Sequence, residues 1–192
     1  IFYNNYIQSH QRFIFANFSA STTSNNISNM VTYNEKTGGR TTRPENINGN
    51  WNTGGNFTYN MAIDTAGYWN VSTYTNLNYT NSVGYFYDNS IKNSVKNTTR
   101  TTAVSERLTS GYRNDWFEFE LNGGFSYNHS RNLLQNNNNL DTWQFSYGAS
   151  TNITLPWGTR IASDISMSSR RGYNDASMNT NELIWNAQIS QG

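Results

Sequence analysis

Apolar and polar residues alternate one by one along much of the chain. Every second residue between 143 and 155 is apolar or threonine, and the residues between them are Gln, Ser, Gly, Asn or Thr. Because successive side chains of a β-strand point to opposite faces, this pattern predicts a strand with one apolar and one polar face. Residues 51–63 and 117–127 repeat the pattern, and weaker versions occur in 14–20, 69–79 and 161–167. No segment shows the period of a helix.

Turn-forming residues divide the chain into strands joined by connections of two kinds. Short connections are expected at residues 9–11, 64–67, 113–115 and 156–158, and longer polar ones at 36–40, 89–97, 135–139 and 172–181. Short and long connections therefore alternate along the sequence. This order is typical of outer-membrane β-barrels, which have short periplasmic turns and longer extracellular loops.

The length of the apolar stripes matches the thickness of a membrane. Trp51 to Ile63 and Trp143 to Leu155 each span 12 residue steps, which correspond to a rise of about 30 Å for a strand tilted near 40°. Aromatic residues gather at the interfaces of transmembrane barrels. We therefore expect membrane-interface positions for the six tryptophans, Trp51, Trp69, Trp116, Trp143, Trp157 and Trp185. The alternative is that aromatic residues simply favour strands and the cores of soluble β-sandwiches.

The amino-acid composition argues against several other classes of protein. Only 13% of the residues are charged and the net charge is +1, which argues against a nucleic-acid partner because phosphate contacts need a basic excess. The mean hydropathy of −0.77 excludes a helical membrane protein but not a barrel, whose alternating strands average to polar. The absence of Cys excludes disulfides and thiolate sites. An aromatic content of 15% argues against disorder.

Candidate catalytic and metal-binding residues are few. His129 is flanked by Asn128 and Ser130, but neighbouring strand residues face opposite ways and no nucleophile motif accompanies them. Glu118 and Glu120 share one face, where lining of a polar lumen is favoured over paired-carboxylate catalysis. The oxygen-rich run at 136–141 could hold Ca²⁺, although a solvated loop suits its spacing better. We expect no catalytic residue, no cofactor and no metal site.

One group of residues is a candidate ligand site at the mouth of the barrel. Arg170, Arg171 and Tyr173 come where a strand meets a long loop. Arginine binds anionic groups through bidentate hydrogen bonds, and an adjacent tyrosine can stack on a sugar ring. The alternative is a charged pair that faces lipopolysaccharide or water.

Two segments resemble a known family. Residues 46–60 (NINGNWNTGGNFTYN) and 112–190 resemble barrel strands of Bacteroidota outer-membrane proteins of the TonB-dependent-receptor-like β-barrel family. The resemblance implies a barrel of about 22 strands, preceded by a plug, that takes up nutrients with energy from TonB. It also implies partners: outer-membrane lipid, the remaining strands of the same barrel, the TonB complex and a surface lipoprotein.

The expected fold is thus all-β, an antiparallel transmembrane barrel wall of about nine strand segments over residues 1–192. Because single-chain bacterial barrels have an even number of strands, we expect the chain to be part of a larger barrel with strands missing on both sides. The expected location is the outer membrane of a Gram-negative bacterium, and the expected function is nutrient uptake. The alternative is a secreted or surface β-rich adhesin or structural protein.

Overall fold

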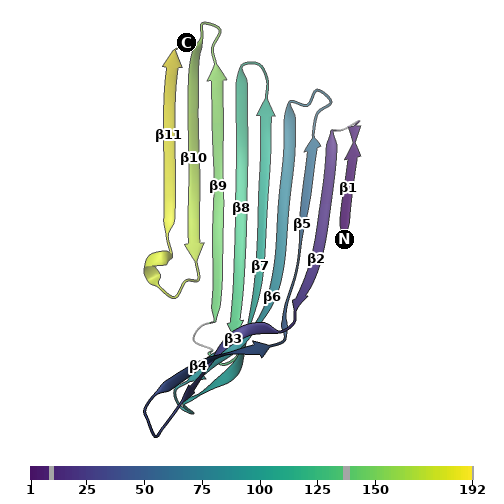
Figure 1. The fold of residues 1–192 in the computed structure, drawn as a ribbon. Helices are drawn as coiled ribbons and strands as arrows, with labels where there is room; N and C mark the ends of the chain where they lie inside the picture. The colour runs from purple at the N-terminus through teal and green to yellow at the C-terminus, as the bar shows by residue number, and fades with distance from the viewer. Residues whose placement is uncertain (9–10, 136–138, 192) are drawn as a thin grey trace.

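The computed structural model describes residues 1–8, 11–135 and 139–191, and in it the chain forms one antiparallel sheet of 11 strands (Figure 1). The all-β prediction is therefore confirmed. The strands are β1 (Phe2–Ile7), β2 (Arg12–Thr23), β3 (Asn26–Tyr33), β4 (Arg40–Ile47), β5 (Asn50–Ala62), β6 (Trp69–Asp88), β7 (Asn93–Arg113), β8 (Phe117–Asn132), β9 (Leu140–Thr154), β10 (Thr159–Arg171) and β11 (Asn181–Gln191). A short 3₁₀ helix, η3 (Ala176–Met178), lies between β10 and β11.

Nine strands follow one another across the sheet in the order β1-β2-β5-β6-β7-β8-β9-β10-β11. The other two, β3 and β4, form a hairpin that leaves this path, so the expectation of about nine segments is corrected to eleven strands. The chain turns away from the sheet near Asn25, which has a φ of 54°, and returns near Gly49, which has a φ of 110°. Left-handed backbone of this kind breaks a strand. The segment between the connections expected at 9–11 and 36–40 therefore contains two strands.

The connections lie at two ends of the sheet (Figure 1). At the upper end are residues 63–68, 114–116 and 155–158, whereas the turn expected at 9–11 falls partly outside the described residues. At the lower end are 89–92, 133–135 and 172–180, and residues 136–138 lie outside the described residues. The long loop expected at 89–97 is wrong, because residues 93–97 belong to β7. These residues pair with β6 beyond the ends of β5 and β8, so no periodic apolar face marked them as strand.

The β3–β4 hairpin packs against this projecting part of β6 and β7, at the lower end of the sheet (Figure 1). The Ser28 hydroxyl accepts a hydrogen bond from the Tyr85 amide at 2.9 Å, and the Ser94 hydroxyl accepts from the Val31 amide at 2.8 Å. Ile47 and Val83 are buried here. The hairpin and the β6–β7 projection thus form a small structure of their own at the end of the sheet.

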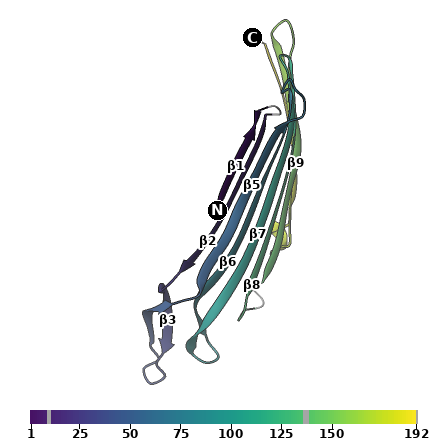
Figure 2. The same ribbon diagram turned by 90° about the vertical axis from the view of Figure 1, so that its right-hand side faces the viewer.

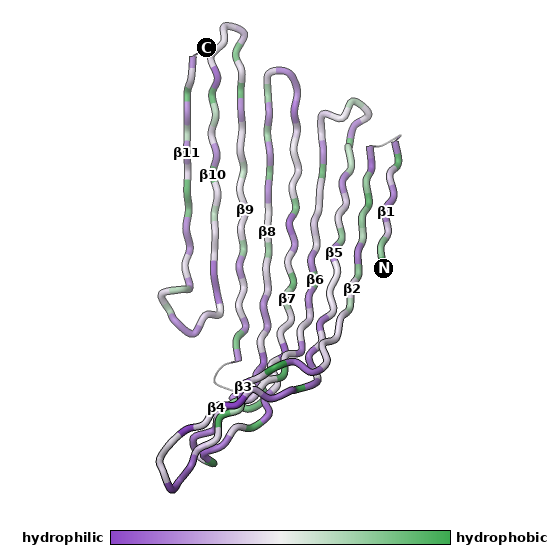
Figure 3. The backbone as a smooth tube through the Cα atoms, viewed as in Figure 1, coloured by the Kyte–Doolittle hydropathy of each residue, from purple (hydrophilic) through white to green (hydrophobic). Residues whose placement is uncertain are grey.

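The rest of the sheet is a single curved layer (Figure 2). Its register places the odd-numbered residues of β5, β6 and β8–β11 on one face, together with the even-numbered residues of β2 and β7. We call this the apolar face, because it holds the aromatic and aliphatic stripes, and the opposite one the polar face. Both kinds of residue mix along each strand, so no strand is uniformly hydrophobic in Figure 3. Among the described residues only three apolar side chains are buried, Ile47, Ala62 and Val83.

The first two strands depart from this division. Phe13 and Phe15 lie on the polar face of β2, where Phe15 makes an edge contact with Phe2 at 5.1 Å between ring centroids. The weak alternation at residues 14–20 is therefore a strand with apolar side chains on both faces. This corner of the polar face is unlike the rest of it.

The sheet is open in this structure. Among the described strands, β1 pairs only with β2 and β11 pairs only with β10, so each has one unpaired edge. Closure of the strands into a barrel therefore stays a prediction.

Candidate functional site

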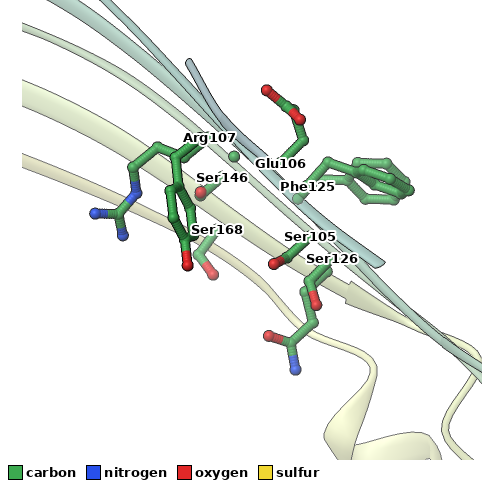
Figure 4. Close-up of a pocket in the computed structure, with 11 residues that line it drawn as sticks. Ser105, Glu106, Arg107, Phe125, Ser126, Ser146 and Ser168 are labelled. Carbon is green, nitrogen blue, oxygen red and sulfur yellow. The ribbon is translucent and has the colours of Figure 1, made fainter. Parts of the chain in front are cut away.

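A hollow of about 460 Å³ lies on the polar face in the middle of the sheet (Figure 4). Its polar-face lining comes from β6–β10: Tyr74, Ser105, Arg107, Gly124, Ser126, Gln144, Ser146 and Ser168. Arg107 is directly opposite Tyr74 on one side and Gly124 on the other. Because Gly124 has no side chain, space is left between Arg107 and Ser146. Figure 4 shows Arg107, Ser146 and Ser168 on one side of the sheet and Phe125 on the other.

Arg107 gives the hollow its charge. Among the residues that the structure describes, its guanidinium has no hydrogen-bond or ion-pair partner. Around it are a phenol and several hydroxyls. A free guanidinium beside hydroxyls and an aromatic ring can bind the carboxylate, phosphate or hydroxyl groups of a polar solute. Sequence reasoning missed Tyr74 and Arg107, because their pairing depends on the β6–β7 register.

The hollow extends toward the loop site expected at residues 170–173. Gln144 lines the hollow and donates a hydrogen bond from Nε2 to the Tyr173 hydroxyl at 2.7 Å. Arg170 is directly opposite Gln144, so it shares the polar face. Arg171 lies on the apolar face and donates to the Thr180 carbonyl and to Asn181 Oδ1. The structure therefore brings Arg170 and Tyr173 near the hollow and separates Arg171 from them.

A second hollow, of about 330 Å³, lies on the polar face near the upper turns. Glu118 and Glu120 line it, as does Arg113, whose guanidinium is 3.6 Å from the Glu118 carboxylate. The two glutamates share one face, as expected from their spacing. An exposed ion pair of this kind adds little stability but gives the polar face fixed charges of both signs.

The tryptophans occupy three levels of the sheet. Trp51 stacks on Tyr79 at 5.0 Å, and Trp143 contacts Tyr127 at 4.2 Å, both toward the lower end of the apolar face. Trp69 begins β6 at the upper end, and Trp116 and Trp157 lie in upper turns. Trp185 lies opposite Ile165, midway along β10 and β11, and donates from Nε1 to Ser163 at 3.0 Å.

An acidic side chain lies in the middle of the apolar face. Glu106 of β7 lies on this face between Val104 and Leu108, and its two carboxylate oxygens accept hydrogen bonds from Thr73 and Thr75. Figure 4 shows Glu106 on the side of the sheet away from Arg107. The threonine hydroxyls satisfy a group that would otherwise be costly to place among apolar side chains.

His129 belongs to a polar cluster at the lower end of the apolar face. Its Nδ1 pairs with Asp141, which also accepts a hydrogen bond from the Tyr127 hydroxyl at 2.9 Å. Arg131 donates from Nε to His129 Nε2 at 3.0 Å. Ser130 and Asn128 are on the opposite face, so the three residues Ser130, His129 and Asn128 do not meet here.

Within the described part of the chain, no three His, Cys, Asp or Glu side chains are close enough to hold a metal ion. Residues 136–138 of the oxygen-rich run lie outside the described residues. In the same described part, no helix is both long enough and apolar enough to cross a membrane.

Two aspartates in the connections have altered acidity. Hydrogen bonds from the backbone amides of Trp69 and Tyr68 lower the pKa of Asp64. The hydroxyl and amide of Ser177 do the same for the pKa of Asp175, ahead of η3. Both carboxylates thus fix the shape of a connection while ionised.

Comparison of the chain with protein-family models, with curated proteins and with solved structures finds no match.

Proposed function

We propose that the chain forms part of the wall of an outer-membrane β-barrel in a Gram-negative bacterium, and that the barrel binds and transports a polar solute. In this proposal the apolar face contacts lipid, and the polar face lines the lumen. Further strands of the same barrel pair with the free edges of β1 and β11. The role is transport and not catalysis.

The main support is that no second layer of the described residues covers the apolar face. Large apolar side chains on it are exposed, among them Tyr147 at 59% and Leu77 at 52% of their surface. Exposure of such a face to water is unfavourable, and this cost normally drives a sheet to pack on a second layer. Hydrocarbon chains of a bilayer supply the missing cover, provided that every backbone group is paired by barrel closure.

The two lower tryptophans provide a second, geometric support. From β9 to β5, the residues in register with Trp143 are Tyr127, Val104, Leu77 and Gly55. Gly55 is four residues from Trp51 along β5. A line from Trp51 to Trp143 therefore shifts by one residue relative to the register at each of the four steps from β5 to β9. A step of about 3.3 Å per spacing of about 4.8 Å corresponds to a tilt near 35°, at the lower end of the range in closed barrels. Tilted in this way, Trp51 and Trp143 lie at one depth.

The polar face suits a lumen. It is rich in Asn, Ser, Thr and Gly, and it contains the hollow around Arg107 and the fixed charges near Glu118. The pair Arg170 and Tyr173 lies where the lower loops would meet a solute first. We propose that these groups and Arg107 bind the solute in turn.

The finer function comes from the resemblance. TonB-dependent receptors use energy from the inner membrane to import nutrients, so we propose uptake of this type. The corresponding partners are the TonB complex and a surface lipoprotein. The alternative, a secreted or surface adhesin, would need its aromatic stripes inside a core, which fits less well with an uncovered apolar face.

Cysteine labelling in the membrane tests the proposal. The chain has no native cysteine, so Ser146→Cys and Tyr147→Cys place single thiols next to each other on opposite faces of β9. The full-length protein is recovered in the outer-membrane fraction and treated with a membrane-impermeant maleimide. We expect labelling of Ser146→Cys through the water-filled lumen, and protection of Tyr147→Cys until the bilayer is dissolved.

Two results would overturn the proposal. The first is recovery of the protein in the soluble fraction without heat-modifiable migration on a gel. The second is equal labelling of both thiols in intact membranes, which would mean that water reaches both faces.

A further inference from the structure

Two arginines lie directly opposite each other on the apolar face near its lower end. Arg100 of β7 is the register partner of Arg131 of β8. Directly opposite side chains have Cβ atoms about 5 Å apart, and like charges in such positions repel. Arg100 has no hydrogen-bond or ion-pair partner among the residues that the structure describes.

Only part of the Arg131 guanidinium has a hydrogen-bond partner in the cluster around His129. Arg131 donates from Nε to His129 at 3.0 Å, while the other ring nitrogen of His129 is directed to Asp141. The acidic group facing this cluster, Asp141, already accepts from Tyr127 and His129. The Nη groups of Arg131 therefore have no protein acceptor within the described residues.

The line from Trp51 to Trp143 gives the depth of Arg100 and Arg131 in the proposed membrane. Trp51, Asn81, Arg100 and Arg131 are successive register partners on β5 to β8. The line from Trp51 to Trp143 moves away from these partners by one residue at each strand. Arg100 is thus two residues, and Arg131 three, beyond the line on the side of the lower loops. With a tilt near 35°, these offsets are about 5 and 8 Å, the depth of the lipid headgroups outside the hydrocarbon.

We propose that Arg100 and Arg131 bind the phosphate of an anionic lipid in the leaflet nearest the lower loops. The phosphate oxygens accept hydrogen bonds from both guanidinium groups and offset their repulsion. The acyl chains then run along the apolar face past Val104 and the rings of Tyr127 and Trp143. His129 acts as a positioning residue, because it holds Nε of Arg131. The proposal rests on the proposed location of the apolar face in a membrane.

Lipid binding by the full-length protein in detergent tests the site. The probes are a diphosphorylated glucosamine glycolipid of the lipid A type, the same lipid without phosphates, and inorganic phosphate alone. We expect the phosphorylated lipid to bind about tenfold more tightly than its dephosphorylated form. The variant Arg100→Gln with Arg131→Gln should lose that preference. A variant with the same charge change, Lys36→Gln with Arg160→Gln, should keep it.

The site would be refuted if the double arginine variant kept the wild-type preference, or if both lipids bound equally to the wild type. Displacement of the lipid by inorganic phosphate at equal concentration would make the site one for free phosphate and overturn the lipid assignment. Heat-modifiable migration of the same preparations is scored separately. A folded barrel without phosphate preference defeats only this inference, whereas a protein that needs no detergent defeats the proposed function.

Discussion

At the scale of single residues, the surroundings of a charged side chain depend on the face or connection in which it lies. Glu106 and Arg107 are neighbours in β7, yet Glu106 lies among apolar side chains and Arg107 faces the hollow. Asp64 and Asp175 are acidic residues in connections, and each binds backbone amides. Two predictions follow from these environments.

The first prediction concerns Glu106. If the apolar face contacts hydrocarbon, Glu106→Val should raise the free energy of unfolding in membranes by about 1 kcal/mol, because a carboxylate near the bilayer centre is unfavourable. The measurement is denaturant unfolding of the protein in vesicles. Ser105→Val, on the polar face, is the control and should give no gain. A loss of stability in Glu106→Val would contradict the placement of this carboxylate in hydrocarbon, because its hydrogen bonds from Thr73 and Thr75 would then be the larger effect.

The second prediction concerns acid sensitivity at Asp64. Its pKa is lowered from 3.8 by the amide of Trp69, so folding gains stability above that ordinary value and loses it as the pH falls through the folded pKa. Asp64→Asn should therefore unfold at a lower temperature than wild type at pH 7. The difference between the two proteins should be smaller at pH 3 than at pH 7, because its loss begins as the pH falls below 3.8. A difference that is equal at both pH values would exclude ionised Asp64 as the cause.

At the scale of elements, the alternation defined strands, but contacts between distant segments set their limits. The β3–β4 hairpin exists because the chain breaks at Asn25 and Gly49, and it is held by Ser28 and Ser94. The loop between β10 and β11 starts at Gly172, which has a φ of 83°. A Cβ at this position would lie 1.8 Å from the carbonyl oxygen of Asp141.

The third prediction concerns this loop. Gly172→Ala should lower the free energy of unfolding by about 1 to 3 kcal/mol, because it combines a left-handed backbone with a clash against β9. It should also expose residues 172–180 to protease, since the Gln144–Tyr173 contact would shift. The control is Gly123→Ala, whose Cβ meets nothing within 4 Å. Equal behaviour of the two variants would argue against the close approach of loop and strand.

At the scale of the whole molecule, the sheet has two unlike faces and two free edges. Among the described residues, burial is confined to a few side chains, such as Val83 under the hairpin and Ala62 at an upper turn. A single layer of this kind gains most of its stability from strand pairing and from whatever covers the apolar face.

The fourth prediction follows from that surface. The chain of residues 1–192 by itself should associate into large particles in aqueous buffer and remain dispersed in detergent micelles. Analytical ultracentrifugation with and without detergent measures this difference. A monodisperse monomer in plain buffer would mean that the apolar face is covered by the chain itself.

The sequence by itself determined the most regular strands and their two faces. The alternation at residues 51–63, 117–127 and 143–155 needs no tertiary information, because side chains of a strand must point alternately to opposite sides. The predicted ligand site at Arg170, Arg171 and Tyr173 did not apply this rule, and Arg171 lies on the other face. Turn residues located most connections for a similar local reason.

Only the tertiary structure decided which residues on neighbouring strands meet. The register joins Tyr74 with Arg107 and Arg100 with Arg131, although each pair is about 30 positions apart in the chain. Nor did the pattern at residues 21–49 and 89–97 predict the hairpin and the β6–β7 projection. These segments are polar on both faces, so their structure depends on contacts such as those of Ser28 and Ser94.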